Sequence, residues 1–264
     1  MTADRTSRLA RFAWLSLTAL SLAAGLLIGY ITVIRPWHMR WGMRPAELAA
    51  AHPGDEFVAA PLRASTRGIT IHAPAAQVWP WLAQISAERA GFYSYDWLEQ
   101  LMLCPIHNAD RIHPEWQNVQ PGDRVALCPQ AEMPPPYEVI QVLPGQALVL
   151  GHRAAPADNL PGALWAESWA FILEPVDANA TRLVVRTRSA IDPAWMSVIE
   201  PGVFIMEYGM LNGIKARSEG LSTPSVGQLL ARAAAGVALA LLVAGAVVFF
   251  RRGQPAPGTS GRAE

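Results

Sequence analysis

The residues of this 264-residue chain that could do chemistry gather in three places. The first place is one loop-like segment with a set of potential metal ligands: Cys104, His107, Asp110, His113, Glu115 and Cys128. Zinc takes cysteine and histidine ligands at short spacings, and Cys104 and His107 have such a spacing. The other spacings match no zinc pattern, so we expect ordinary loop residues here, with no metal and no cofactor.

The second place is the segment GFYSYDWLEQLML, whose pattern predicts a helix. It holds a polar and aromatic group: Tyr93, Tyr95, Asp96 and Glu99. Tyr95 or Asp96 could orient a polar group of a ligand, beside the apolar surface of Trp97. In the alternative interpretation, Asp96 caps the helix or forms a salt bridge, and the tyrosines pack with their hydroxyls in water.

The third place is a pair of predicted strands joined by the turn EPVDANAT. Side chains alternate along a strand, so one face of the first strand carries Trp165, Glu167, Trp169 and Phe171. One face of the second strand carries Arg182, Arg186 and Arg188. A register shift of one residue decides whether these arginines oppose Glu167 or point away from it. Facing inward, Arg186 would favour a carboxylate or phosphate ligand; facing outward, the arginines form a solvated face.

The composition excludes several classes of protein. Charged residues make up 16% of the chain and hydrophobic residues 52%. Twenty-one basic and twenty-one acidic residues cancel, so no overall positive field attracts nucleic acid. A disordered chain would carry many more charges. The two cysteines cannot build a disulfide framework and say little about the redox compartment.

The elements that must position these residues lie between two apolar segments. Ala13–Ile34 has no charge, follows three arginines and is longer than the apolar core of a cleaved signal peptide. Ala233–Phe250 is also uncharged and ends at Arg251 and Arg252. We therefore expect a cell-membrane protein with two spans, with both termini on one side of the bilayer. Arginines flank both sides of the spans, so the sequence does not select the side of the central part.

The expected organisation has seven parts. They are a tail (1–12), a membrane helix (13–34), a connector (35–67), a central domain (68–220), a linker (221–232), a second membrane helix (233–250) and a polar tail (251–264).

The pattern of the central domain is that of an α+β fold. Strands are predicted at 68–73, 124–128, 137–143, 147–152, 164–173 and 182–190, and helices at 75–85, 91–103 and from either Asp192 or Glu200 onward. The short turn between the last two strands permits only an antiparallel hairpin. We expect the last helix to be gripped by a curved antiparallel sheet, with one apolar stripe buried against the strands: Val203, Met206, Met210 and Ile214.

Several of these segments resemble a known superfamily. ITIHAPAAQVWPWLAQI is similar to the opening strand and helix of the START-like (SRPBCC, helix-grip) superfamily, which includes polyketide cyclases and lipid-transfer domains. RAGFYSYDWLEQL, IHPEWQ, SWAFILEP, TRLVVRTR and EPGVFIMEYGMLNGIKARSE resemble a bacterial, often membrane-anchored subgroup with no assigned reaction. The resemblance implies a helix-grip fold over about residues 68–220. Because the superfamily contains both binders and enzymes, fold alone does not transfer a function.

Three functions fit this interpretation. The first is membrane-anchored binding of a hydrophobic or amphipathic small molecule, such as a lipid or polyketide-like compound, between the sheet and the last helix. The expected apolar lining is Trp97, Trp169, Phe171, Met206 and Met210. The expected polar groups are Tyr95, Asp96 and Arg186. The alternatives are a cyclase or dehydratase that uses Asp96, His113 or Glu115 as acid or base, and an interaction domain with a filled core. The expected partners are the small molecule and the lipid bilayer, and not nucleic acid.

Overall fold

The computed structural model describes residues 2–101, 103–129 and 135–221. The second expected membrane helix, 233–250, lies outside these residues. The helices are α1 (Thr2–Gly29), a π-helical turn (Tyr30–Ile34), α2 (Arg35–Met39), α3 (Pro45–Ala49), α4 (Ala75–Ala83), α5 (Asp96–Leu101) and α6 (Met196–Ser218). Short 3-10 turns lie at Asp55–Val58, Pro114–Trp116 and Pro156–Asp158.

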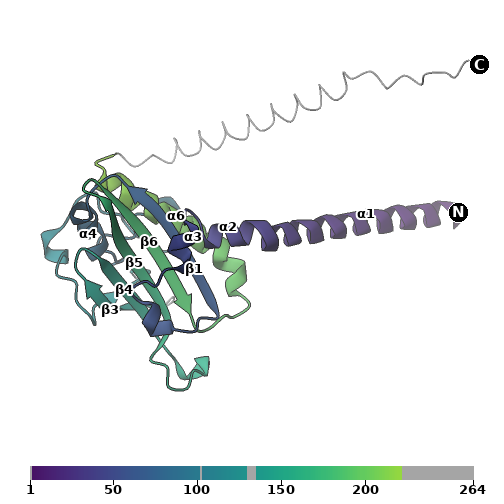
Figure 1. Cartoon of the computed structure of the whole chain (residues 1–264). Helices are drawn as coiled ribbons and strands as arrows, with labels where there is room; N and C mark the ends of the chain where they lie inside the picture. Colours follow the sequence, from purple (N-terminus) through teal and green to yellow (C-terminus); the bar gives the residue numbers. More distant parts are fainter. Residues whose placement is uncertain (1, 102, 130–134, 222–264) are drawn as a thin grey trace, which may run out of the picture. The chain divides into compact units, whose positions relative to one another are not determined.

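Six strands form one antiparallel sheet in the order β1-β6-β5-β4-β3-β2 (Figure 1). The strands are β1 (Arg63–Ile71), β2 (Arg124–Val125), β3 (Tyr137–Leu143), β4 (Ala147–Arg153), β5 (Trp165–Asp177) and β6 (Ala180–Ser189). The β5–β6 hairpin is antiparallel, as the short turn between them predicted. The α+β class, with a long C-terminal helix packed on an antiparallel sheet, is confirmed.

One side of the sheet, which we call the helix face, packs against α4 and α6. Its strands contribute Leu148, Leu150, Phe171, Leu183 and Val185, all at most 1% exposed. The helices contribute Val78, Leu82, Met210, Leu211 and Ile214. Each such side chain stabilises the fold by about 1.5–3 kcal/mol on burial, so this layer is the main core. The alternation of apolar residues along β5 and β6 therefore directs one set of side chains to α6.

The predicted stripe on α6 is only partly buried. Met210 and Ile214 are buried against the strands, as predicted, and Met206 is half-buried. Val203 is 45% exposed, so the prediction that it is buried is wrong. The reason is that the first turns of α6 contact α2 instead of the strands, through the ring of Phe204 against Trp37 at 5.5 Å.

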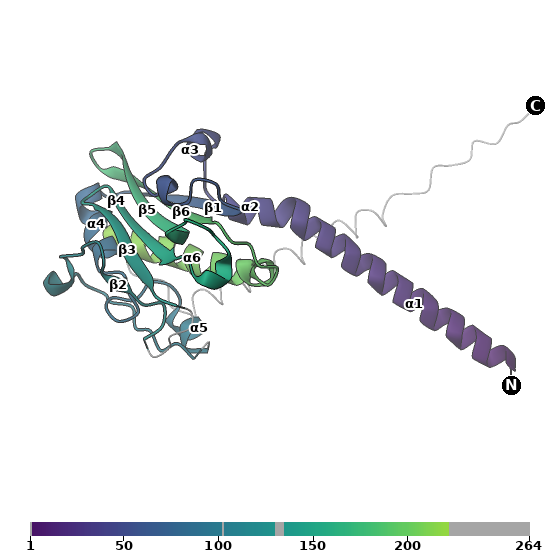
Figure 2. The ribbon, with the colours of Figure 1, turned by 90° about the horizontal axis from the view of Figure 1, so that it is seen from below.

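The opposite side of the sheet, the connector face, is covered by the segment that leads into β1. Figure 2 shows α3 and α6 on opposite sides of the sheet. A small second apolar cluster lies here, made of Ala147, Val149, Ala170, Ile172 and Val184 with Met43 and Phe57 from the connector. The connector is thus part of the packed domain, and β1 begins at Arg63, five residues before the predicted start at Gly68.

The arginines of β6 hold this connector. Arg182 donates from Nε and Nη2 to the carboxylate of Glu47 at 2.9 and 3.0 Å. Arg186 Nε donates to Asp55 Oδ1 at 2.7 Å, and Arg188 Nε donates to the carbonyl oxygen of Val58 at 2.8 Å. The register therefore turns these three arginines away from Glu167.

The N-terminal helix continues directly into the domain. Among the described residues, Trp14–Met39 is the one helical stretch long and apolar enough to cross a membrane by length and composition. Its end is tied to α6, because Arg35 donates from Nε and Nη2 to the Glu200 carboxylate at 2.7 and 2.9 Å.

Candidate ligand-binding site

The register of the sheet places four polar side chains in one row across the helix face. Arg63 on β1 pairs with Ser189 on β6, Ser189 with Glu167 on β5, and Glu167 with His152 on β4. Arg63 and Glu167 lie at or near the start of their strands, and His152 and Ser189 lie at or near the end of theirs. Because neighbouring strands are antiparallel, all four residues lie at the same end of the sheet. We call them, with Tyr137 at the start of β3, the polar row.

Glu167 is the centre of the polar row. The Tyr137 hydroxyl donates to Oε1, and Arg63 Nη2 donates to Oε2 at 3.3 Å. His152 Nδ1 lies 3.9 Å from Oε1. The side chain of Glu167 remains 14% exposed, whereas the core beneath it is closed. The row is therefore the point at which polar groups of the helix face meet solvent.

The protonation of the row follows from its surroundings. Burial, and then the Glu167 carboxylate, raise the pKa of Tyr137, so its hydroxyl keeps the proton that it donates. Burial lowers the pKa of His152, against the opposing effect of Glu167. His152 Nε2 lies 2.9 Å from the Pro135 carbonyl oxygen, which can only accept. Neutral His152 therefore carries its proton on Nε2 and presents a bare Nδ1 to Glu167.

Arg63 brings an unused donor to the row. Its Nε is buried and has no hydrogen-bond partner among the described residues. Asp192 Oδ1 lies 3.7 Å from this atom, beyond hydrogen-bond range. A buried donor left unpaired costs about 1–3 kcal/mol, so an acceptor that reached Arg63 would recover that energy.

The next row inward is aromatic. Trp169 packs against Phe171 at 4.8 Å, Tyr137 at 5.4 Å and Phe92 at 6.1 Å between ring centroids. His152 stacks on Tyr137 at 3.6 Å. These rings make an adaptable apolar wall directly below the polar row.

A buried ion pair closes the inner end of the wall. Arg67 on β1 donates to Glu207 on α6, and the two side chains are 2% and 5% exposed. The Trp169 indole N–H donates to the other oxygen of Glu207 at 3.0 Å, and Arg67 Nε donates to the His38 carbonyl oxygen at 2.8 Å. All members of this group have partners, so it is a closed structural network, unlike the polar row.

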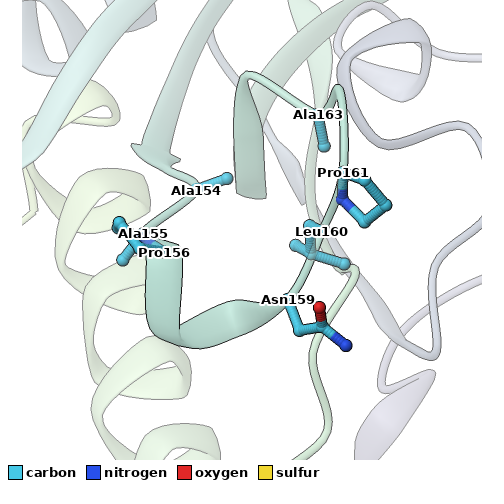
Figure 3. Close-up of a pocket in the computed structure, with 7 residues that line it drawn as sticks. All are labelled: Ala154, Ala155, Pro156, Asn159, Leu160, Pro161 and Ala163. Atoms are coloured by element: carbon cyan, nitrogen blue, oxygen red, sulfur yellow. The ribbon is translucent and has the colours of Figure 1, made fainter.

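The β4–β5 loop rises from the polar row and carries a shallow hollow. The side chains that line it are apolar except for one amide: Ala154, Ala155, Pro156, Asn159, Leu160, Pro161 and Ala163 (Figure 3). The hollow measures about 360 Å³ and is widely open to solvent. The hollow begins two residues after His152 and ends four residues before Glu167. Because both of these residues belong to the polar row, the apolar surface of the hollow lies next to the row along the chain.

The residues predicted from sequence divide between regions. Trp169 and Phe171 lie in the aromatic row, and Met210 lies in the closed core beneath it. Arg186 lies on the connector face with Asp55 and is not brought to the others.

The remaining predicted residues form a separate group around α5. The Asp96 carboxylate accepts from Asn108, and Tyr95 packs 6.4 Å from Trp97. Tyr95 also lies against Gly209 of α6, and a Cβ there would approach its ring to 2.7 Å. Ser94 joins this group to α6 by donating to the Met206 carbonyl oxygen.

The sequence interpretation missed most of the polar row. No sequence pattern assigns a role to Tyr137 or His152, and Arg63 lies within the expected connector (35–67). One signal was present: Glu167 shares a face with Trp169, so the partners of Glu167 on neighbouring strands had to line the same surface.

The segment with potential metal ligands is arranged differently. Cys104 and Cys128 form a disulfide with a Cα–Cα distance of 5.4 Å. His113 stacks on Trp116 at 4.1 Å and contacts Glu115, which is 62% exposed. Among the described residues, no three acidic, histidine or cysteine side chains gather as a metal site would require. Of the three residues predicted as acid or base, His113 and Glu115 contact each other at 3.1 Å, whereas Asp96 is bonded to Asn108.

The similarity of this chain to known proteins is limited to the fold of solved structures. No protein-family model matches the chain, and no curated protein matches it. A solution structure from Thermobifida fusca is 15% identical with a TM-score of 0.41, covering 61% of this chain and 97% of that one. The di-domain ARO/CYC protein BexL is 18% identical with a TM-score of 0.33, covering 60% of this chain and 47% of that one. The Aha1 dimer from Colwellia psychrerythraea is 14% identical with a TM-score of 0.32, covering 58% and 97%.

Proposed function

We propose that this protein is a membrane-anchored binder of an amphipathic small molecule, held at the polar row of the helix face. The polar end of the ligand meets Arg63 and Glu167, and its apolar part lies against Tyr137 and Trp169. The observation that carries the proposal is the unused buried donor of Arg63 beside a partly exposed carboxylate. A purely structural network would be expected to resemble Arg67 and Glu207, where every charge has its partner.

The groups of the row select the chemistry of the ligand. Arg63 offers an N–H donor, so the ligand presents an acceptor such as a carbonyl, hydroxyl or acidic oxygen. Glu167 is already bonded to Tyr137 and Arg63, and its remaining lone pairs favour a ligand that also donates. A hydroxylated or enolic ring with an apolar body meets both requirements. The lipid and polyketide-like classes expected from sequence both include such molecules.

The N-terminal helix supplies the anchor in this proposal. The stretch Trp14–Met39 has the length and composition of a membrane span, and the apolar side chains of its helix are not covered by other parts of the described chain. Arg35 and Glu200 fix its end to α6. A tethered domain would meet a membrane-dissolved ligand without that ligand crossing bulk water.

The disulfide favours one side of the membrane. Disulfides persist in oxidising compartments and are rare in the cytosol. We therefore place the domain on the oxidising side, with Arg5, Arg8 and Arg11 on the cytoplasmic side of the first span. A shift in gel mobility of protein trapped with a thiol-alkylating reagent, seen only after reduction, is the expected result. Free thiols in protein trapped directly from cells would contradict this placement.

Native mass spectrometry of the detergent-extracted full chain tests the binding function. The expected result is a small molecule that is retained on the folded protein and released on unfolding. Trp169→Ala removes the apolar wall and should reduce retention, whereas Trp169→Phe keeps a ring and should retain more. A chain that carries no molecule in any preparation would leave the interaction-domain alternative in its place.

A second candidate function is acid–base catalysis in the same row. The specific observation is that the Tyr137 hydroxyl donates to Glu167 while the bare Nδ1 of His152 lies close to the same carboxylate. Such a trio could move a proton on a bound hydroxylated ring, as a cyclase or dehydratase requires. A retained molecule whose mass changes by one water during incubation with wild type, but not with Tyr137→Phe, would favour this function.

A further inference from the structure

We infer that the first turns of α6 lie in the lipid–water interface, so that the polar row opens toward the bilayer. This inference deepens the proposed function and rests on its membrane anchor. The feature that carries it is an exposed apolar stripe at the N-terminal end of α6.

The stripe has helical spacing and no charge. Trp195, Val198, Ile199, Gly202 and Val203 recur at the intervals of one helix face. The large side chains of the stripe are exposed by 59% at Trp195, 79% at Val198, 43% at Ile199 and 45% at Val203. Glu200 is the one charged residue between Trp195 and Met206, and its side chain is buried against Arg35. Contiguous exposed apolar surface of this kind marks an interaction site.

The opposite side of the same turns is already used. Glu200 is 2% exposed and accepts two hydrogen bonds from Arg35, and Phe204 packs on Trp37 and His38. The stripe is therefore held rigidly outward, because the inner side of the helix is fixed to α2.

The bilayer is the occupant that this position favours. Arg35 and Glu200 join the stripe to the candidate membrane helix through one bidentate pair. The exposed apolar surface of that helix continues to its end, with Ile34 at 50% and Trp37 at 57%. Tryptophans are enriched where a protein passes through the membrane surface. Trp37 lies at the end of the candidate membrane helix, and Trp195 lies at the start of the stripe.

The consequence concerns the route of the ligand. Asp192, which lies 3.7 Å from Arg63 Nε, is four residues before the start of α6. The polar row and the stripe are therefore neighbours in space as well as in sequence. With the stripe seated in the interface, an amphipathic molecule moves from the lipid headgroup layer to Arg63 over a short path.

Spin labelling of the full chain in phosphatidylcholine–phosphatidylglycerol vesicles tests the inference. A nitroxide is attached at Val198→Cys, with Val176→Cys as the matched control, since Val176 is 51% exposed in the β5–β6 turn region. Both native cysteines are bonded to each other and leave the new thiol as the target. The label at Val198 should collide with lipid-dissolved oxygen and lose its collisions with a water-soluble nickel chelate. The label at Val176 should show the reverse.

Each other outcome overturns the inference. A Val198 label that meets the nickel chelate as often as the Val176 label places the stripe in water. Shielding from both reagents, with spin–spin broadening that disappears on mixing with unlabelled protein, indicates a second copy of the chain. Shielding without broadening, relieved by deletion of residues 222–264, indicates the apolar C-terminal segment. Failure of the chain to float with the vesicles contradicts the membrane anchor itself, and so separates failure of the proposed function from failure of this inference.

Discussion

On the connector face, Arg182, Arg186 and Arg188 each bond to an acceptor from the segment that covers them. On the helix face, Arg67 is satisfied in the same way by Glu207, but Arg63 keeps a buried Nε that no described residue bonds. Both faces use arginine, and within the described residues Arg63 is the one arginine with a buried side-chain nitrogen that lacks a hydrogen-bond partner. The comparison separates charges that fix the architecture from charges available to a ligand. Charges that fix the architecture have all their hydrogen bonds made within the protein, whereas a charge available to a ligand has a donor or acceptor left over.

The largest expected effect is at the closed network of the helix face. Arg67→Met should destabilise the protein by about 3–5 kcal/mol, because it leaves Glu207 buried without its countercharge. Guanidinium unfolding of the full chain in detergent, followed by tryptophan fluorescence, measures the loss. The double variant Arg67→Met with Glu207→Leu is the control and should recover most of the stability. If the free energy of unfolding of Arg67→Met lay within 1 kcal/mol of the wild-type value, Glu207 would not depend on Arg67 for its countercharge.

A smaller loss is expected on the connector face. Arg182→Met removes the bidentate pair with Glu47 and the bond to the Gly42 carbonyl oxygen. The three bonds share one guanidinium and are not additive, and the freed Glu47 carboxylate is 12% exposed and can be hydrated. A loss of about 2–3 kcal/mol is therefore expected, which is that of a single hydrogen bond to a charged group. Ligand retention should be unchanged once the protein is folded. Reduced retention at full folding would mean that the two faces are not independent.

Glu99 provides a buried carboxyl that has Asn108 nearby but makes no hydrogen bond within the described part of the chain. Burial, with a smaller effect from Asp96, raises its pKa from 4.5 to about 7. Between these values the folded state holds one more proton than the unfolded state, so stability falls as pH rises through this window. In Glu99→Gln the free energy of unfolding should therefore fall less between low and high pH, by up to about 3 kcal/mol. Unfolding at pH 5 and pH 8 measures it, and an equal decline in both proteins would contradict the prediction.

The smallest effect is expected within the polar row. Tyr137→Phe removes one hydroxyl that donates to Glu167 and should cost about 1.5 kcal/mol, the lower end for a bond to a charged group, because Glu167 is partly exposed and keeps Arg63. Because Tyr137 also lines the ligand site, retention measured by native mass spectrometry should fall although the fold remains. Unchanged retention would limit the site to Arg63 and Glu167.

The sequence predicted the parts of the fold whose patterns are regular. The strand at Tyr137–Leu143 matches its predicted limits, and the β5–β6 hairpin pairs as its short turn requires. The start of β1 was missed because Arg63 and Arg67 face inward, and charged residues on the buried side conceal the alternation of a strand. Their partners, Glu167 and Glu207, lie more than 100 residues away, so pairing became visible only with the register.

The candidate site was predicted only in its aromatic part. Trp169 and Phe171 could be placed on one face by alternation alone. The sequence alone does not decide which face of the sheet carries Arg186, because a register shift of one residue moves it to the other face. The helix predicted at 91–103 begins only at Asp96, because Tyr93 adopts a positive φ of 59° where its carbonyl crosses close to Gly213 of α6. Such a contact depends on tertiary packing and has no local signal.

The most direct test of the central claim compares two carboxylates that differ mainly in the face on which they lie. Glu167 and Asp55 are 14% and 21% exposed, and each contacts an arginine. Native mass spectrometry of full-length Glu167→Gln and Asp55→Asn, extracted side by side with wild type, measures the fraction that retains a small molecule. The expected result is loss of the molecule from Glu167→Gln and wild-type retention by Asp55→Asn. Equal retention by both variants, or loss confined to Asp55→Asn, would contradict a ligand site on the helix face.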